Sequence, residues 1–301
     1  MKNSTVLPII VLFHPNEELL YRLLFSLVGQ VNTICIIDNT PVTVKEKVLA
    51  ICNKMSLEAV YFDLNENKGI AYAQNVGIRY AIEKNYSHVL LLDQDSQLPC
   101  EFISNMKKHE AILLNNGHKV AAVGPAFKDE KTNEIAAAIQ QTKPTQIDIN
   151  TKNPIHCDYI IASGSLIRTS VFNEVGLMLD ELFIDWVDIE WGERCAHDGF
   201  NSYMIPSIVM NHSIGDEYVN YLGRKINLHS DFRNYFIVRN AVYLLKLKKI
   251  KSNLKLSLFI KIPQYVFFYS LFSKRKCYSF FLLLRAIGDG AIGKMDKGYF
   301  N

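Results

Sequence analysis

Apolar runs of four to eight residues alternate with amphipathic stretches through the first half of this 301-residue chain. The runs span residues 6–13, 33–37, 59–62, 88–92 and 120–123. They are continuously apolar, whereas a half-exposed strand would alternate, and this indicates strands buried on both faces. Because helical patterns separate the runs, the sequence predicts an α/β fold with a mostly parallel sheet flanked by helices.

Helix signals fall between these strands. Asn16 can cap a helix that runs to about residue 28, where Gly29 would end it. The remaining predictions follow in chain order: helices over 43–53 and 69–84, a helix opening at Pro99, a loop or small hairpin over 126–154, a strand at 158–161, a helix over 186–198, a strand at 202–205 and helices after residue 229.

Carboxylates follow two of the predicted strands. Asp38 ends the second strand, and Asp93 and Asp95 form a D-x-D motif after the fourth. Ligands of open α/β sheets bind at these carboxyl ends. Two anions in one crevice cost free energy unless a cation or sugar hydroxyls compensate them. Mg²⁺ or Mn²⁺ with a nucleoside diphosphate would do so; the alternative is a solvated turn at the strand end.

A second acidic cluster opens the helix predicted over 186–198. Asp188 and Glu190 lie in its first turn, where the helix dipole favours anions, and Trp186 and Trp191 flank them. A carboxylate between aromatic walls can have a raised pKa and act as a general base. The alternative interpretation is helix capping by Asp185 or Asp188.

Three other motifs in the sequence are less specific. His212 suits a third ligand of a D-x-D metal site, although a single histidine is more often structural. Gly69 opens a helix and would let a ligand approach its N-terminus, unless it merely marks the helix start. Residues 288–293 match G-x-G-x-x-G, but they follow a helical stretch and leave no room for a βαβ unit, which excludes a dinucleotide site.

Composition excludes several other classes of protein. A hydrophobic share of 49% excludes a disordered chain. No two of the six cysteines lie closer than 17 positions, which argues against a disulfide scaffold and a zinc ribbon. No P-loop and no G-x-S-x-G motif occurs. The run at 6–13 is too short for a membrane span or a secretory signal, so we expect a cytoplasmic protein.

Charge divides the chain into two parts. Residues 1–223 hold 17 basic and 27 acidic side chains, whereas residues 224–301 hold 16 basic and 3 acidic ones. We therefore predict a functional boundary near residue 224, between a domain over 1–223 that carries the acidic motifs and a helical, basic and aromatic C-terminal region over 224–301.

The C-terminal region suggests a surface contact. Its longest uncharged stretch, 262–273, is too short to span a membrane. Lysines and arginines mixed with aromatic residues fit a helix lying on an anionic membrane surface. The alternatives are a subdomain packed on the core or a homodimer contact. Nucleic-acid binding is disfavoured because the first 223 residues are acidic and the C-terminal region is strongly apolar.

Eight segments in order resemble family 2 glycosyltransferases of the GT-A fold, and most of all the bacterial rhamnosyltransferase group that builds O-antigen and related polysaccharides. The segments are the opening strand with 14–16, then 36–39, 67–75, 92–96, 163–165, 183–191, 212–216 and 233–240. The resemblance therefore covers roughly residues 5–240.

The resemblance implies a role for each matched residue. Asp188 matches the catalytic base of an inverting single displacement, Asp95 a metal ligand for Mg²⁺ or Mn²⁺, and His212 a histidine that completes this site in some relatives. The donor-side matches are Asp38 at the nucleotide base, Asp93 near the ribose, Asn67, Gly69 and Asn75 around the donor, and Arg239 at a phosphate. The acceptor-side matches are Glu190, Trp191 and Arg233. The sequence departs from the family pattern at Gly192 and Glu193, which puts the packing there in doubt.

The implied substrates are a nucleotide-diphosphate sugar and a glycan or polyprenyl-diphosphate-linked acceptor at the inner face of the cell membrane. Rhamnose on dTDP is the favoured donor, and a UDP-sugar such as galactofuranose is the alternative. A nucleotidyltransferase usually has a glycine-rich basic loop after the first strand. Residues 14–18 follow the first strand here and form no such loop, which argues against that class. A non-catalytic scaffold would be expected to lack the D-x-D motif or the base.

Overall fold

The computed structural model describes residues 5–129, 133–212, 218–221, 224–227 and 229–300. An eight-stranded mixed sheet forms its centre, with the order β3-β2-β1-β4-β9-β5-β10-β8. Its parallel strands are β1 (Val6–Leu12), β2 (Thr33–Asp38), β3 (Glu58–Asp63), β4 (His88–Asp93), β5 (Val120–Asp129) and β10 (Asn201–His212). The antiparallel strands are β8 (Ile155–Cys157) and β9 (Ser165–Arg168).

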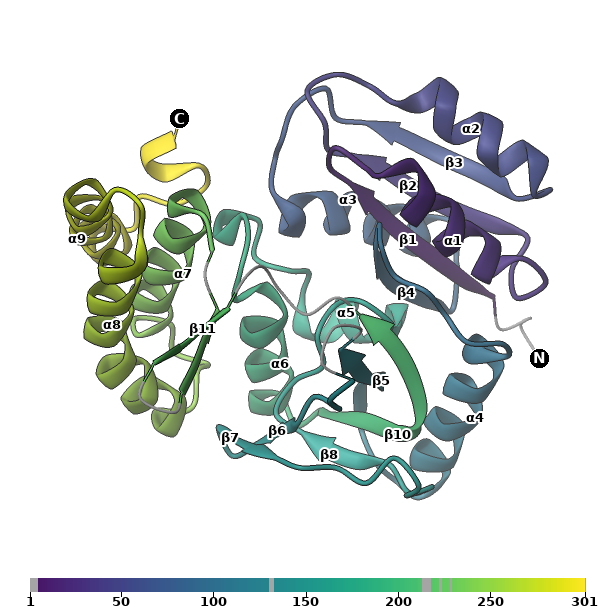
Figure 1. Cartoon of the computed structure of the whole chain (residues 1–301). Coiled ribbons are helices and arrows are strands. Elements are labelled where there is room, and N and C mark those ends of the chain that lie inside the picture. Colours follow the sequence, from purple (N-terminus) through teal and green to yellow (C-terminus); the bar gives the residue numbers. More distant parts are fainter. Residues whose placement is uncertain (1–4, 130–132, 213–217, 222–223, 228, 301) are drawn as a thin grey trace.

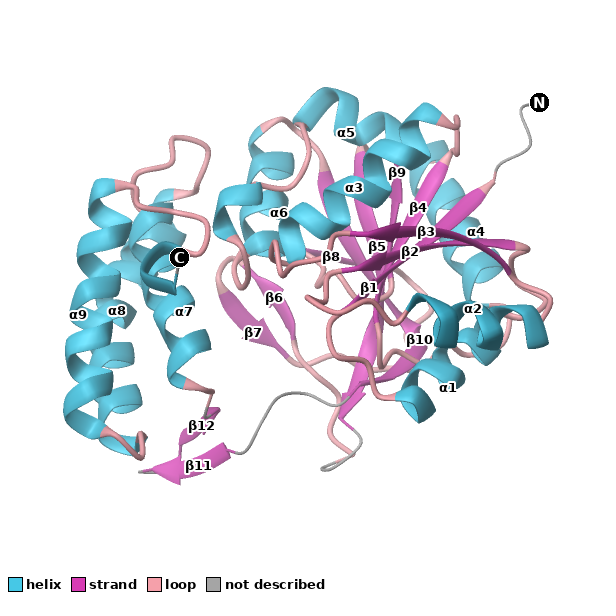
Figure 2. Ribbon diagram, turned by 90° about the horizontal axis from the view of Figure 1, so that it is seen from above, coloured by secondary structure: helices cyan, strands magenta, loops and turns pink. Residues whose placement is uncertain are grey.

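Helices cover both faces of the sheet, as the continuous apolar strands require (Figure 2). Ile10 and Leu12 of β1 pack with α1 (Glu17–Leu27), α2 (Lys45–Lys54) and α4 (Phe102–Asn115). Ile9 and Val11 point to the opposite face, against α3 (Ile70–Glu83), α5 (Thr169–Val175) and α6 (Val187–His197). The alternation of side chains along one strand thus supplies both cores.

Most predicted elements are confirmed with small shifts. Asn16 caps α1, because its side chain accepts hydrogen bonds from the backbone N–H groups of Glu18 and Leu19. The expected hairpin within 126–154 consists of β6 (Ala138–Gln140) and β7 (Lys143–Thr145), although β5 itself extends to Asp129. Strand β10 is longer than predicted and changes its register against β5 between Ile205 and Val209.

The prediction of a strand at 158–161 is wrong. The strand lies earlier, as β8, and residues 158–164 form a connection to β9. Asp158 turns the chain away from the sheet: it accepts a hydrogen bond from Thr142 N and contacts Lys251 Nζ at 3.4 Å. Ile160 is buried against Ala126 and Met204, Ile161 packs on the core, and both line a cavity, so a sequence pattern cannot distinguish them from strand residues.

The C-terminal region folds into three packed helices, α7 (Asp231–Leu244), α8 (Ser252–Phe272) and α9 (Lys276–Ile292), beside the sheet (Figure 1). Short elements flank them: η1 (Asp180–Leu182), β11 (Tyr218–Tyr221), β12 (Arg224–Asn227) and η2 (Gly298–Phe300). Tyr235, Val238 and Leu283 belong to the same buried cluster as Ile9 and Trp191, so one core joins these helices to the sheet. No helix within the described ranges is long and apolar enough to cross a membrane.

Candidate functional site

A cavity of about 1090 Å³ opens at the carboxyl ends of the central strands. Residues from the ends of β2 and β4, from the turn before α3, from β5 and β6 and from the 158–164 connection line it. The polar lining residues include Asn39, Asn67, Asp93, Gln94 and Asp95, the apolar ones include Phe127, Ile139, Ile160, Ile161 and Met204, and His229, Phe232 and Arg233 line it as well. This is the crevice that the parallel sheet predicts.

The D-x-D segment is held at the cavity by its neighbours. Gln94 accepts a hydrogen bond from Phe13 N at 2.8 Å and donates one to Phe13 O at 3.1 Å, which joins the end of β4 to the end of β1. Ser96 is buried and hydrogen bonds to Ser163 across 2.6 Å. With both flanks fixed, Asp93 lies half-buried and Asp95 exposed at the cavity wall.

These two carboxylates could supply part of a metal site, which is how the sequence predicts their role. Among the described residues, no group of three or more His, Cys, Asp or Glu side chains could hold a metal ion. Hard carboxylate oxygens suit Mg²⁺ or Mn²⁺, and a bound diphosphate and water would supply the remaining oxygens. His212 ends β10, whose Asn211 bridges to Gln97 beside Asp95, but its side chain lies outside the described residues. Its role as a ligand stays a prediction.

Asp188 lies in the first turn of α6, in a small cavity of about 10 Å³ that also contacts Ile160, Ala162 and Trp191. Burial raises the pKa of its carboxyl group to about 6, although backbone N–H groups of Ile189 and Ala162 donate to it. Ile160 borders both this space and the large cavity. Asp188 does not line the large cavity itself, and its own small space adjoins that cavity at Ile160.

The chain enters α6 through a strained segment. Phe183, Asp185 and Trp186 have φ values of 64°, 61° and 66°, a region that non-glycine residues occupy at a cost and usually near functional sites. Gly69 packs directly against this segment: a Cβ atom there would lie 2.5 Å from Phe183 O. Ile70 N donates to the same oxygen at 2.7 Å. Gly69 thus lines the cavity and also allows this close backbone approach.

The resemblance predicts that Asp38 contacts the nucleotide base, but Asp38 does not line the cavity. It is fully buried, and its carboxylate accepts hydrogen bonds from Thr40, Thr43, Val44 N and Tyr61. Burial raises its pKa, but these hydrogen bonds outweigh that effect and leave the pKa below its usual value. The carboxylate thus folds the loop after β2. The neighbouring Asn39 reaches the cavity and accepts a hydrogen bond from Lys68 N at 2.7 Å.

Asn75 and Arg239 are also directed away from the cavity, contrary to the predicted donor contacts. Asn75 is buried in α3, where its side chain bonds to both backbone groups of Met178. Arg239 is fully buried in α7 and bonds to backbone oxygens of Glu181, Leu182 and Asp296. Both side chains hold the segment before α6.

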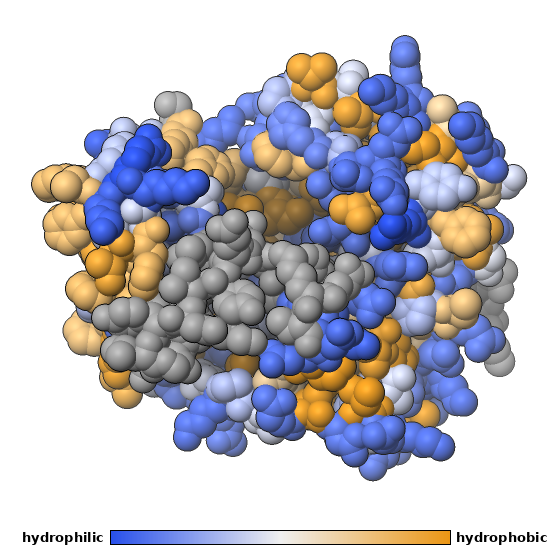
Figure 3. Space-filling model, in the orientation of Figure 1, coloured by the Kyte–Doolittle hydropathy of each residue, from blue (hydrophilic) through white to orange (hydrophobic). Residues whose placement is uncertain are grey.

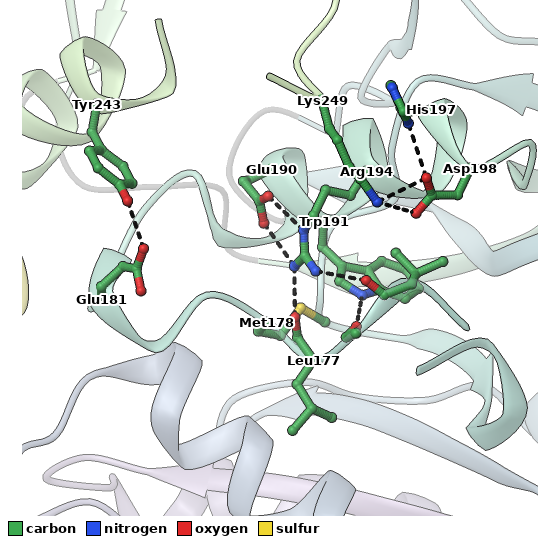
Figure 4. A network of polar contacts seen from close by, with 12 residues as sticks. Leu177, Met178, Glu181, Glu190, Trp191, Arg194, His197, Asp198, Tyr243 and Lys249 are labelled. Carbon is green, nitrogen blue, oxygen red and sulfur yellow. Dashed lines mark hydrogen bonds and ion pairs between the residues drawn. The ribbon is translucent and has the colours of Figure 1, made fainter. Parts of the chain in front are cut away.

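Of the three predicted acceptor-side residues, Glu190, Trp191 and Arg233, only one lines the cavity. Glu190 bonds to Arg194, whose guanidinium also donates to Leu177 O at 2.7 Å (Figure 4). Trp191 is buried, and its indole N–H donates to Gly176 O at 3.0 Å. Neither lines the large cavity. Arg233 does, and Asp185 holds its guanidinium through bonds of 3.0–3.2 Å.

The departure at Gly192 and Glu193 has a local explanation. A Cβ atom on Gly192 would lie 2.6 Å from Tyr159 Cβ, so glycine lets the 158–164 connection pack on α6. Glu193 is buried and accepts a hydrogen bond of 2.8 Å from the backbone N–H of Lys251, just before α8 begins. These two residues adapt α6 to its neighbours.

Known proteins show the same organisation. The dTDP-rhamnosyl transferase RfbF of Shigella flexneri is 37% identical over 256 residues, 81% of each chain. The S. aureus TarS 1–349 structure in complex with UDP-GlcNAc has a TM-score of 0.58 at 14% identity and covers 95% of this chain and 81% of its own. The mannosyltransferase PcManGT from Pyrobaculum calidifontis, in complex with GDP-Man and Mn²⁺, has a TM-score of 0.55 at 12% identity. This match covers 95% of the present chain and 75% of the PcManGT chain.

The structural likenesses show the fold, and the sequence match shows the family. Residues 9–176, which include the D-x-D segment and the turn before α3, match the glycosyl transferase family 2. With a relative of 37% identity over most of both chains, this match makes the chain a glycosyltransferase of family 2.

Proposed function

We propose that this enzyme transfers L-rhamnose from dTDP-rhamnose, with inversion, onto a glycan acceptor in the synthesis of a cell-surface polysaccharide such as an O-antigen. The named activity of the Shigella flexneri relative supports the donor. The observation that carries the chemistry is the desolvated carboxyl group of Asp188, with its pKa raised to about 6, in a small space that adjoins at Ile160 the large cavity lined by Asp93 and Asp95.

In this mechanism Asp188 is the general base. Its carboxylate takes the proton of an acceptor hydroxyl as that oxygen attacks the anomeric carbon, and the bond to the dTDP leaving group breaks in the same step. A pKa of about 6 leaves the carboxylate ionised at neutral pH but more basic than an exposed aspartate. The apolar side chains around it exclude water that would compete with the acceptor.

A divalent cation completes the donor site in this proposal. Asp95, with Asp93 beside it, would hold Mg²⁺ or Mn²⁺, and Mn²⁺ is named with two of the similar solved structures. When bound, the ion would neutralise the charge that develops on the leaving diphosphate. Asn39, Asn67 and Gly69 line the same cavity, which supports a contact with the nucleotide sugar in this proposal.

A donor screen tests the proposal. Thermal unfolding with Mg²⁺ or Mn²⁺ should shift upward with dTDP-rhamnose and less with UDP-galactofuranose, UDP-GlcNAc or GDP-mannose, because specific binding stabilises the folded state. Transfer to a glycan acceptor should follow the same order. A larger shift and faster transfer with a UDP-sugar would assign the enzyme to that donor instead.

We also propose that α8 and α9 bind the inner face of the cell membrane, where a polyprenyl-diphosphate-linked acceptor would lie. Large apolar side chains stand exposed along both helices, and Figure 3 shows such residues gathered on this side of the molecule. They are Leu256, Phe259, Ile260, Phe267, Tyr278, Phe280, Phe281, Leu284 and Ile292. An apolar surface of this kind marks an interaction site.

Charge favours a membrane over a second copy of the chain. Residues 239–285 contain eleven Lys and Arg and no Asp or Glu, and Lys261 and Lys274 are exposed beside the apolar residues. A symmetric dimer through this face would oppose like charges, whereas anionic lipid would compensate them at about 1 kcal/mol for each well-placed cation.

Flotation with vesicles tests this surface. The enzyme should float with phosphatidylcholine vesicles that contain phosphatidylglycerol and much less with phosphatidylcholine alone. Phe259→Ser with Phe281→Ser should abolish flotation, whereas Phe25→Ser on α1, which removes an equally exposed ring of 64% exposure, should not. Flotation unaffected by the α8–α9 changes, or a stable dimer that does not float, would contradict the proposal.

A further inference from the structure

The segment that leads into Asp188 is held by two consecutive side chains of α7. Asn240 is fully buried, and its amide donates to the carbonyl oxygens of Leu182, Ile184 and Asp185 at 2.9, 2.8 and 3.1 Å. Its own oxygen accepts from Arg239 Nε and a terminal guanidinium nitrogen at 2.9 and 2.8 Å. One side chain therefore bonds to three of the five residues 182–186 that lead into α6.

Arg239 extends this contact to the end of the chain. Its guanidinium donates to Leu182 O at 3.0 Å, Glu181 O at 3.3 Å and Asp296 O. Asp296 N in turn donates to Glu181 O at 3.0 Å. Three segments that are far apart in the sequence thus meet at one arginine and one asparagine.

The chemistry of these contacts matters because the segment is strained. Left-handed backbone at Phe183, Asp185 and Trp186 persists when surrounding contacts over-determine it. Carbonyl groups buried without donors are costly, so the amide of Asn240 selects this backbone over relaxed ones. Trp186 adds a bond from its indole N–H to Ile237 O at 3.0 Å, again on α7.

We propose that Asn240, oriented by Arg239, is a positioning residue that sets the location of the catalytic base by fixing the backbone of residues 182–186. This inference rests on the proposed role of Asp188. It assigns a role in the reaction to Asn240 and Arg239 although neither side chain lines the cavity.

Asn240→Ala tests the inference against a matched control. The variant should lower kcat roughly tenfold to 10²-fold, because a displacement near 1 Å can cost that much. The KM for the donor and its Kd by calorimetry should stay unchanged. Asn234→Ala removes an equally buried asparagine of α7 that donates to His229 O, away from residues 182–186. At a temperature at which both variants are folded, the kcat of Asn234→Ala should stay close to that of the wild type.

A second variant keeps the test decisive if Asn240→Ala does not fold. Arg239→Lys retains the positive charge but loses the fork that orients Asn240. It should lower kcat less than Asn240→Ala and again leave donor binding unchanged. Wild-type kcat in a folded Asn240→Ala or Arg239→Lys, or equal losses in Asn240→Ala and Asn234→Ala, would overturn the inference.

Asp188→Asn, measured in parallel, separates the two proposals. If Asp188→Asn is inactive while the α7 variants retain normal kcat, the base assignment stands and the positioning inference fails. If Asp188→Asn retains normal turnover, the assignment of the base itself fails.

Discussion

The two acidic segments of the site differ in how they are held. Asp93 and Asp95 follow directly from a buried parallel strand, and Asp95 is exposed at the cavity wall. Asp188 follows a strained segment, lies among apolar groups and has a raised pKa. Desolvation increases the affinity of a carboxylate for a proton, whereas an exposed carboxylate is accessible to a cation. This difference in surroundings is the basis of the two roles proposed for these residues, metal ligand and general base.

Removing the buried carboxylate should have the largest effect. Asp188→Asn should lower kcat by on the order of 10²–10⁴, the usual contribution of general base catalysis, and leave the Kd for dTDP-rhamnose unchanged by calorimetry. Asp198→Asn, at the end of the same helix and paired with Lys249, is the control and should retain activity. A weakened donor affinity in Asp188→Asn would indicate that both segments serve the donor.

Removing the exposed carboxylate should affect binding as well as turnover. Asp95→Ala should lower turnover by roughly 10²-fold and weaken donor binding, because a bound cation supplies several kcal/mol of charge stabilisation. Chelation of the metal by EDTA should lower the turnover of the wild type to that of Asp95→Ala and should change the turnover of the variant little. An Asp95→Ala enzyme that responds to Mg²⁺ or Mn²⁺ as the wild type does would place the metal elsewhere.

The pH dependence of the reaction should report the buried segment. The base must be ionised, and the pKa of Asp188 in the free enzyme is raised to about 6 by desolvation, so kcat/KM should fall about tenfold for each pH unit below this value. A pH–rate profile of kcat/KM, measured with donor and acceptor below saturation, checks it. An acid limb near pH 4 would mean that the base is an ordinary, exposed carboxylate.

The smallest expected effect is on stability. The folded pKa of Asp188, about 6, lies above the usual 3.8, so the folded state binds more protons between these values and stability falls as pH rises through them. Above pH 6 Asp188→Asn should therefore be more stable than the wild type, by roughly 1–3 kcal/mol in urea unfolding. The gain should shrink as pH falls below 6.

The pKa of Asp198 is shifted in the opposite direction to that of Asp188, so Asp198 serves as the comparison. Hydrogen bonds from Lys249 and His197 lower its pKa, and the stability that they contribute is present above the usual pKa and lost as pH falls. Asp198→Asn should then lose stability at neutral pH. If both substitutions destabilise the protein at pH 8, burial of Asp188 is not costly and the contrast between the segments is weaker than the structure indicates.

How far the site could be predicted depends on how local each signal is. The helix cap at Asn16 and the carboxylates after β4 were predicted because strand, turn and cap are decided within a few residues. Asp38 and Asn39 show the limit: adjacent residues at a strand end point to opposite sides, and the sequence favoured the charged one, which is buried. Residues 158–161 show another limit, since cavity walls and strands are equally apolar.

The sequence by itself determined the sheet, the edge at which the cavity opens and the acidic residues that could serve there, because these depend on periodicity and on residue chemistry. The tertiary structure decided which polar residues face the cavity and which hold the backbone. Arg239, Asn240 and Asn75 are polar residues whose partners lie 57, 58 and 103 positions away. The direction of such side chains is set by contacts between distant segments, which form when the whole core packs.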